Sequence, residues 1–425
     1  MNNRILRFDW IVFSILFATS SLILIGRKVG NLSFYSLILL AVVCIILRIN
    51  HYGTGFVHFV RSFWKLHLAM AGMFIAILLN QLISQDFAAR SLDYPSRMAF
   101  FAFLAWVSLM CSARMFQWLQ WSYVLGAILA TIKMYIITDG GTSRAQYVDF
   151  MPIIEFADLT LLLGFFSILS IKYQSGTVLT RRIGIAVKIL AGLGTLYAAF
   201  LSETRGTWLG IPFLCAIAAI VLFDRFNFKK KITITLVVVT ILTGSFVLSP
   251  RVQNRIQAAE QEITMYSNDR WSDTSVGTRL GLWKTSIVIF AEHPLIGIGR
   301  ENFQSTLQRL GREGKISPVI ARQIHSHNEI FYNMVTLGSF GLIGLMALYL
   351  VPLMFFARKL RHEDDELRAT AGMGVILCVG YMIFGLTDVM LMWGVSDNFY
   401  AVFAAIMFSH IYQRERCLML AKDTV

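Results

Sequence analysis

The sequence predicts an all-α integral membrane protein, and three observations carry this prediction. Of the 425 residues, 56% are hydrophobic and only 15% are charged, whereas roughly a quarter of the residues in soluble domains are charged. The apolar residues gather in runs of about 20, the length that a helix needs to cross the hydrocarbon of a bilayer. These runs lack the alternating polarity of membrane β-strands, and only helices satisfy their own backbone at this length.

About twelve apolar runs are long enough to be transmembrane helices. The first run follows Arg4 and Arg7 directly and lacks an obvious small-residue cleavage site. We therefore expect it to be a retained helix and not a signal peptide. The predicted spans are residues 10–26, 31–48, 64–84, 98–114, 117–137, 152–171, 184–202, 207–223, 231–249, 329–355, 369–391 and 394–412.

The distribution of positive charge predicts the orientation, because Lys and Arg mark cytoplasmic loops. Alternate loops such as KYQSGTVLTRR and FDRFNFKKK are rich in them, whereas SETRG and MWGVSDN are poorer. Both termini are therefore expected in the cytoplasm of a bacterium, with the protein in the inner membrane. This divides the chain into nine helices over 1–249, one large, partly helical periplasmic loop over 250–327, and three helices with a cytoplasmic tail over 328–425.

The net charge of +13 has two sources. One is the cytoplasmic signal for orientation. The other is a set of Arg and Lys residues in the loop at 250–327, which orientation does not require. On that face nucleic acid is excluded as a partner, and an anionic membrane lipid or a phosphate-bearing substrate fits better. On the cytoplasmic face, HEDDELR at 362–368 is expected to be a solvated turn.

The stretch HSHNE, at 325–329, precedes the tenth predicted span. Ser326 and Glu329 have the spacing of a capping box, which would place His327 in the first helical turn. The positive end of a helix disfavours imidazolium, so His327 would stay neutral, as a general base must; the alternative is that it only helps to cap the helix. His325, His327 and Glu329 do not share one helical face, so no metal is expected.

The turn SETRG, at 202–206, places Glu203 and Arg205 between two apolar runs. An Arg at mid-membrane costs about 2.5–3.5 kcal/mol on insertion, so Arg205 is expected at the membrane edge or beside a partner. It forms either a boundary ion pair with Glu203 or an anion clamp, because a guanidinium matches phosphate oxygens. Arg279 and His327 would lie on the same face. One base and two arginines suit a reaction with a diphosphate leaving group.

Three linked motifs resemble the O-antigen ligase family, within the superfamily that also holds the O-antigen polymerases. Each motif alone is weak, but their order and shared face are fairly specific for the superfamily. The motifs cover about 200–345, and the rest of the chain matches only in hydropathy. They are SETRG before a Trp-containing helix, RLGLW (279–283) followed by HPLIGIGRENF (293–303), and HNEIF (327–331) followed by LGSFG (337–341).

The resemblance implies a membrane glycosyltransferase that uses neither a metal nor ATP or another cofactor. Such enzymes move a polysaccharide from undecaprenyl diphosphate to a sugar hydroxyl of lipid A–core in the periplasm, with inversion at the anomeric carbon. By motif, Arg205 and Arg279 would bind the diphosphate, and His327 would deprotonate or orient the acceptor hydroxyl. Arg300 is a further candidate for the clamp or a surface charge, and Glu203, Ser326 and Glu329 would support the site.

Other functions fit parts of the pattern. An O-antigen polymerase would share the chemistry but use a second lipid-linked glycan as acceptor, and such proteins tend to have two large outer loops. A secondary transporter would need related halves and broken or charged helices at the membrane midplane, and the sequence offers neither. A scaffold or polysaccharide-binding subunit would not need the histidine and arginines. The ligase is the preferred interpretation.

Overall fold

The structure, a computed structural model, is helical apart from one short antiparallel β-ladder between β1 (Tyr147–Val148) and β2 (Met151–Pro152). Three 3-10 turns, η1 (Asp139–Gly141), η2 (Ser170–Lys172) and η3 (Met390–Met392), connect helices. The structure describes residues 2–49, 55–143, 145–173, 176–223, 250–268 and 273–422, with single positions at 230, 233, 236 and 240.

Most of the described helices overlap the predicted apolar runs, but the predicted span 98–114 contains only one eight-residue helix in full, and 64–84 forms two helices. Their bounds are α1 (Asn2–Leu22), α2 (Val29–Ile46), α3 (Phe56–Ser62), α4 (Trp64–Met70), α5 (Gly72–Ser84), α6 (Ala89–Ala99), α7 (Phe101–Ser108), α8 (Ala113–Ile137), α9 (Ile153–Leu169), α10 (Val178–Leu201), α11 (Arg205–Leu222), α13 (Pro250–Asn268), α14 (Ser275–Glu292), α15 (Phe303–Arg312), α16 (Pro318–Ala321), α17 (Glu329–Lys359), α18 (Asp365–Phe384) and α19 (Gly394–Lys422).

Seven of the described helices are long and apolar enough to cross a membrane, and α4 with α5, which meet at a bend of 57°, would form an eighth span. The apolar part of α1, Phe8–Leu22, is shorter. These helices confirm the prediction of an all-α membrane protein. The predicted span at 231–249 lies largely outside the described residues, so the total of twelve, the division into domains and the side of the membrane stay predictions.

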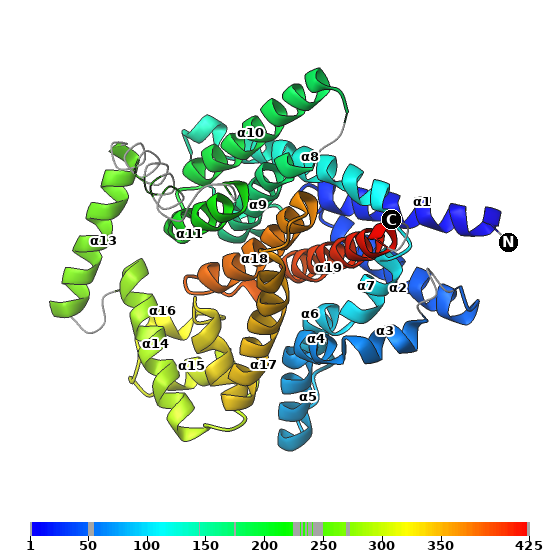
Figure 1. Cartoon of the computed structure of the whole chain (residues 1–425). Helices are drawn as coiled ribbons and strands as arrows, with labels where there is room; N and C mark the ends of the chain where they lie inside the picture. Colours follow the sequence, from blue (N-terminus) through cyan, green and yellow to red (C-terminus); the bar gives the residue numbers. More distant parts are fainter. Residues whose placement is uncertain are drawn as a thin grey trace.

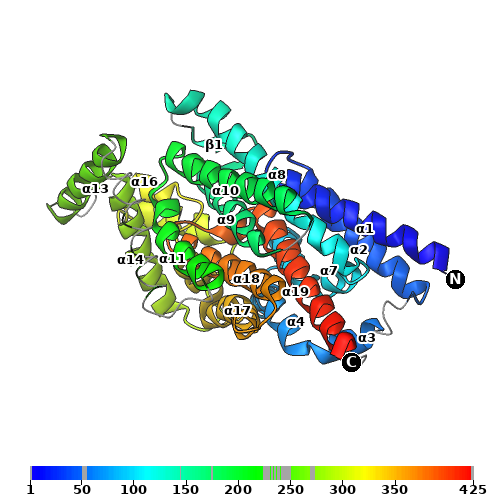
Figure 2. The same ribbon diagram turned by 45° about the horizontal axis from the view of Figure 1, so that its top comes forward.

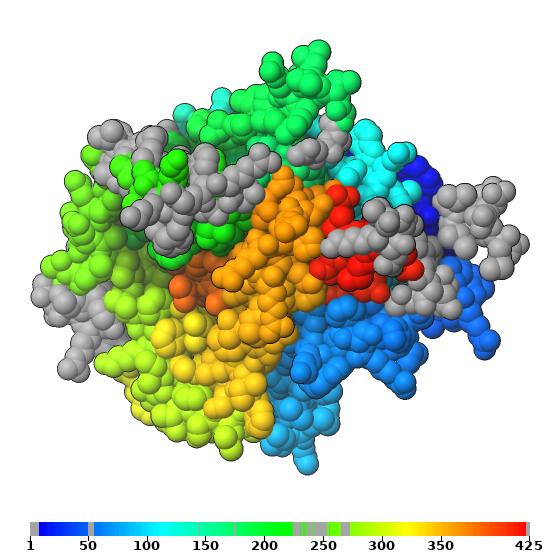
Figure 3. All heavy atoms as spheres, viewed as in Figure 1, coloured from blue at the N-terminus to red at the C-terminus, as the bar shows by residue number. Residues whose placement is uncertain are grey.

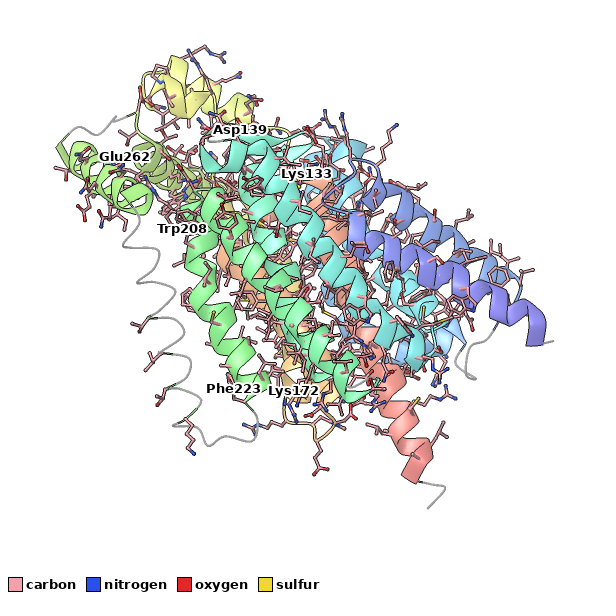
Figure 4. All side chains as sticks on the ribbon, turned by 90° about the horizontal axis from the view of Figure 1, so that it is seen from above. Lys133, Asp139, Lys172, Trp208, Phe223 and Glu262 are labelled. Atoms are coloured by element: carbon pink, nitrogen blue, oxygen red, sulfur yellow. The ribbon has the colours of Figure 1, made fainter. Side chains whose placement is uncertain are left out.

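The bundle has two ends, which Figure 4 shows from above. Asp139, Trp208 and Glu262 lie toward one end, and Lys172 and Phe223 lie toward the other. We call the first end the loop end, because α13 to α16 lie there. In Figure 1 the helices α18 and α19 lie in the middle of the bundle, with α8 to α11 on one side and α3 to α7 on the other, and Figure 2 shows the same arrangement after rotation.

The opposite end holds a buried ionic network. Glu366 at the start of α18 lies 2.7 Å from His410 of α19, and Arg414 pairs with Asp364 at 2.7 Å. Glu366 and Arg368 are both buried. The expectation that HEDDELR is a solvated turn was therefore wrong for these two residues, because a partner from α19 compensates the charge of Glu366.

A break in α17 explains the glycines of two motifs. Gly338 has a φ of 63° and a ψ of −151° inside the helix, which frees backbone groups that must find partners in an apolar environment. The segment 294–299 supplies hydrogen-bond partners for these groups. Gly297, with a φ of 67°, comes so close to α17 that a Cβ there would lie 2.5 Å from the backbone nitrogen of Leu337. The glycines of GIGREN thus allow the backbone of this segment to contact the backbone of α17. The hydrogen bonds are Ile298 N–H to Val335 O (3.0 Å), Gly299 N–H to Thr336 O (2.8 Å) and Ser339 N–H to Pro294 O (2.8 Å).

This contact fixes α13 to α16 against the bundle. Figure 3 shows the yellow-green segment as one lobe that lies directly beside α17, whose colour runs from golden yellow to orange. Phe303 and Leu307 of α15, together with Leu282 of α14, form a small core of their own with residues of α17. The lobe is therefore a packed extension of the bundle.

Replacing Gly338 by Ala is expected to unfold this junction. A Cβ at Gly338 would lie 2.4 Å from the backbone carbon of Leu295, and the φ/ψ values are almost restricted to glycine. We expect a loss of at least about 2 kcal/mol in the free energy of unfolding, measured as a lower melting temperature of the purified protein in detergent. Gly314→Ala is the matched control, because Gly314 also has a positive φ but nothing within 4 Å of its Cβ position. Equal melting temperatures for the two variants would contradict this explanation.

Candidate active site

The start of α17 is capped by Asn328. Its side-chain oxygen accepts hydrogen bonds from the backbone N–H groups of Ile330 and Phe331, and its amide donates to Leu386 O at 2.9 Å. The capping box predicted for Ser326 and Glu329 was therefore wrong, because an Asn two residues after Ser326 already occupies the N-cap position.

Ser326 and Glu329 instead hold the surrounding loops. Ser326 is fully buried; its hydroxyl donates to Asn328 O at 2.8 Å, and its carbonyl accepts from the indole N–H of Trp283 in α14 at 3.1 Å. The Glu329 carboxylate accepts from the Asn333 side chain at 2.8 Å and from Leu391 N–H at 2.9 Å. Both residues hold the surrounding loops by bonds other than those of a capping box, and their role in supporting a catalytic site stays a prediction.

His327 lies just before the helix and not in its first turn, which corrects the prediction. Its φ of 51° is in the left-handed region, a strained position for a non-glycine residue that often marks a functional site. The imidazole is partly exposed, and its Nδ1 lies 3.5 Å from Oδ1 of Asp388. With Nδ1 turned toward a carboxylate, Nε2 is the nitrogen that can accept a proton from a substrate.

Asp388 is the main site residue that the sequence analysis missed. It lies in the connection between α18 and η3, is almost fully buried, and its Oδ1 also accepts from the backbone N–H of Val389 at 2.8 Å. Burial by itself would raise the pKa of Asp388, but its interactions with His327, with His325 and with the backbone N–H of Val389 hold it below its ordinary value. Asp388 lies inside the predicted span 369–391, where an acidic residue is a sign of function, but nothing in the local sequence links it to HSHNE.

His325 is the third member of a cluster with His327 and Asp388. Its ring is buried and lies 4.3 Å from that of His327, centroid to centroid. Burial lowers the pKa of His325 to about 4, an effect that Asp388 opposes and that His327 and Arg279 reinforce. The ring is therefore neutral at pH 7, and its Nδ1 accepts the backbone N–H of His327 at 3.2 Å, which helps to hold the strained backbone.

His325, His327 and Asp388 could by distance form a metal site, because one ligand atom from each lies within 4.8 Å of the others. The donor set fits a metal poorly. The Nδ1 lone pair of His325 already accepts the N–H of His327, which leaves a histidine and a carboxylate, fewer than the three protein ligands of a catalytic zinc site.

Arg205 is the first residue of α11, directly after the turn 202–204. Its guanidinium lies 3.8 Å from Glu262 of α13, and the second oxygen of Glu262 accepts the N–H of Val276 at the start of α14 at 2.9 Å. Glu262, which sequence analysis did not single out, thus connects the helix start that carries Arg205 with the first turn of α14. Glu203 has a φ of 52°, and its pairing with Arg205 stays a prediction.

Gly206 packs the start of α11 against the connection that holds Asp388. A Cβ at Gly206 would lie 2.2 Å from the hydroxyl oxygen of Thr387, so only glycine allows α11 to begin this close to the connection that holds Asp388. The Gly of SETRG therefore makes a contact between two distant parts of the chain, and it places Arg205 and His327 around the same connection.

Arg279 reaches the site from α14. It is half-buried, and it lies close enough to His325 to act on its charge. Trp283, one turn further on, stacks on Phe331 at 5.4 Å between ring centroids, so α14 is held against the start of α17.

Arg300 faces a different part of α17. Its guanidinium donates to the Asn333 side chain at 3.0 Å and lies 5.7 Å from the ring centroid of Tyr332. The same Asn333 donates to Glu329. Arg300 is thus engaged in holding the helix start, and its role in the diphosphate clamp stays a prediction.

Fold and site together define an all-α membrane protein that carries a histidine–carboxylate pair and two arginines near helix starts at one end of its bundle. A family profile described as O-antigen ligase matches residues 190–346, the segment that contains Arg205, Arg279 and His327. Over this segment the chain is similar to the O-antigen ligase family, which confirms the resemblance seen in the three motifs.

Two relatives extend the comparison. An O-antigen ligase of Escherichia coli is 25% identical over 298 residues, which are 70% of this chain and 67% of the relative. An uncharacterized protein of Haemophilus influenzae is 24% identical over 202 residues, 47% of this chain and 50% of that protein. The matched segment thus spans half of the Haemophilus protein, and the substrates of this chain have to be argued from its site.

Replacing Gly206 by Ala is expected to separate Arg205 from Asp388. The added methyl group would overlap the Thr387 hydroxyl, so we expect a loss of activity of at least about tenfold with the protein still inserted in the membrane. Activity is read as polysaccharide transferred by membranes that contain equal amounts of each variant. The double variant with Thr387→Ala removes the overlapping oxygen and should recover part of the loss; no recovery would show that Gly206 acts otherwise.

The lowered pKa of His325 predicts acid sensitivity. The unfolded chain takes up a proton on this residue near pH 6.5, whereas the folded protein does so only near pH 4. The contribution of His325 to the free energy of unfolding is therefore fully present above pH 6.5. As the pH falls from 6.5 to 4, the free energy of unfolding decreases by up to about 1.4 kcal/mol per pH unit. The melting temperature in detergent should drop from pH 7 to pH 5, and less so in His325→Asn, which keeps an acceptor for the N–H of His327. An equal drop in both proteins would argue against His325 as the cause.

Proposed function

We propose that this protein is an O-antigen ligase: a membrane glycosyltransferase of the bacterial inner membrane that moves polysaccharide from undecaprenyl diphosphate to a sugar hydroxyl of lipid A–core. The observation that supports the proposal is the close packing of Gly206 on Thr387, which brings the helix start that carries Arg205 to the connection that holds Asp388, the carboxylate facing His327. In the proposed site, a cation for the leaving group and a base for the attacking group face one space.

In this mechanism His327 is the general base. Its Nε2 accepts the proton of the acceptor hydroxyl, while Asp388 orients the ring through Nδ1 and stabilises the imidazolium that forms. The position of His327 outside the helix, with its side chain partly exposed, leaves room for a sugar to approach. A buried carboxylate held by a backbone N–H costs little reorganisation during the reaction.

Arg205 and Arg279 take the charge of the leaving diphosphate. The acceptor oxygen forms a bond to the anomeric carbon as the bond from that carbon to the diphosphate oxygen breaks, so the configuration inverts and undecaprenyl diphosphate leaves with its electron pair. Guanidinium groups match phosphate oxygens in a bidentate manner, and helix starts favour anions. Arg205 begins α11, and Arg279 lies near the start of α14, so side-chain charge and helix dipoles act together.

The proposal places the site at the periplasmic face, with both termini in the cytoplasm, and needs neither a metal nor another cofactor. The donor would be the undecaprenyl-diphosphate-linked O-antigen, and the acceptor would be lipid A–core. The poor fit of His325, His327 and Asp388 to a metal supports cofactor-independent transfer. An O-antigen polymerase, with a lipid-linked glycan as acceptor, is the second candidate because it would use the same groups.

Loss of the gene distinguishes these functions, with lipopolysaccharide analysed on a gel. A ligase deletion leaves lipid A–core without any O-antigen bands while polymer accumulates on the lipid carrier. A polymerase deletion leaves a single repeat on the core. Unchanged banding would reject both functions.

Complementation with variants tests the residues. We expect His327→Ala, Arg205→Ala and Arg279→Ala each to lower transfer by at least about a hundredfold, because each removes a base or a donor aimed at developing charge. Arg309→Ala is the matched control, since Arg309 is a largely exposed arginine of α15 in the same lobe and should support normal banding. Normal banding with His327→Ala at equal protein levels would reject its role, and inhibition of the purified enzyme by EDTA would reject metal independence.

A further inference from the structure

A chain of buried hydroxyl groups runs through the turn that precedes Arg205. The Ser202 hydroxyl lies 2.8 Å from Ala199 O and 2.8 Å from the Thr204 hydroxyl. The Thr204 hydroxyl lies 2.6 Å from that of Thr207, and the Thr207 hydroxyl lies 2.5 Å from Oδ1 of Asp158 in α9. All the side chains of this chain are buried.

The number of protons decides the direction of these bonds. The chain has four oxygen–oxygen contacts, and each needs one proton. The hydroxyl groups of Ser202, Thr204 and Thr207 supply one proton each. The Thr204 N–H donates to the Ser202 hydroxyl at 3.3 Å, but its proton does not lie in any of the four oxygen–oxygen contacts. If Asp158 were ionised, one pair of oxygens would be in contact without a proton. A protonated Asp158 supplies the fourth, so every hydroxyl donates toward Ala199 O.

The surroundings of Asp158 favour this form. Its side chain is fully buried, and its second oxygen has no hydrogen-bond partner. Two other carboxyl groups face it: Glu155, one turn earlier on α9, and Asp388. Because Asp388 is the carboxylate that faces His327, a second buried negative charge this close would be costly.

We propose that Asp158 is a positioning residue, whose protonated carboxyl group donates to Thr207 and, through Thr204 and Ser202, fixes the turn that aims Arg205 at the diphosphate. This inference deepens the proposed function and rests on it. The turn needs such support, since Thr204 makes no side-chain cap of its own for α11 and Glu203 has a positive φ. A shift of about 1 Å in a binding group can cost on the order of a hundredfold in rate.

Binding of farnesyl diphosphate to the purified protein in detergent tests this role. We expect Asp158→Ala to weaken binding about tenfold, because the turn loses its anchor, and Asp158→Asn to bind as the wild type does, because its amide N–H can donate to Thr207 in the same way. Thr207→Val interrupts the chain of hydroxyl groups but keeps the shape of the side chain, so it should weaken binding as much as Asp158→Ala does. Thr207→Ser keeps the hydroxyl group and should bind with wild-type affinity. Wild-type affinity in Asp158→Ala or Thr207→Val would overturn the proposal.

Infrared spectroscopy tests the protonation directly. The wild-type spectrum should contain a carbonyl band of a protonated carboxylic acid that disappears in Asp158→Asn and persists in Glu155→Gln. A spectrum in which Asp158→Asn removes only a carboxylate band would overturn the proposal, even if Asp158→Ala is poorly folded. Arg205→Ala separates this inference from the function on which it rests. If Arg205→Ala binds farnesyl diphosphate with wild-type affinity, the proposed role of Arg205 in binding the diphosphate is rejected. If Arg205→Ala binds weakly but Asp158→Ala binds with wild-type affinity, only the positioning role of Asp158 is rejected.

Discussion

A charge buried in an apolar bundle must find a partner, and this constraint determines the loop end of the structure. The connection between α18 and α19 holds Asp388, and it is fixed to the start of α17 by Asn328, Glu329 and the backbone. The imidazoles of His325 and His327, from the segment before α17, lie beside the Asp388 carboxylate. The strained position of His327 follows from this arrangement, because the chain turns sharply to face the carboxylate before the helix begins.

Close backbone contacts at glycine bring the remaining parts of the site together. Gly206 lets α11 start beside Thr387, and Gly297 and Gly338 let the segment after α14 cross the broken helix α17. The glycines of the three motifs thus mark contacts between distant segments. Since α14 is also tied to the start of α17 by Trp283, the helices that carry Arg205 and Arg279 are both positioned relative to His327.

Much of this arrangement could be predicted from the sequence, but the pairing of distant residues could not. Apolar runs predicted the position of most described helices, because span length is set by the bilayer. They did not show the break between α4 and α5, the break in α17 or the short helix α7 within 98–114. The motifs predicted Arg205, Arg279 and His327, whereas Asp388, Glu262 and Asp158 belong to no motif. Asp388 and Asp158 lie inside predicted spans, where an acid is a sign of function, but only the contacts show their partners. The capping box failed because sequence spacing could not show that Asn328 would take the cap.

The most direct test of the central claim is a structure of the protein with undecaprenyl diphosphate bound in a lipid environment. The account predicts both phosphates at the loop end, within hydrogen-bonding distance of Arg205 and Arg279, with the end of the diphosphate that would carry the sugar turned toward Nε2 of His327. A diphosphate bound at the opposite end of the bundle, or at the loop end without contact to either arginine, would contradict it.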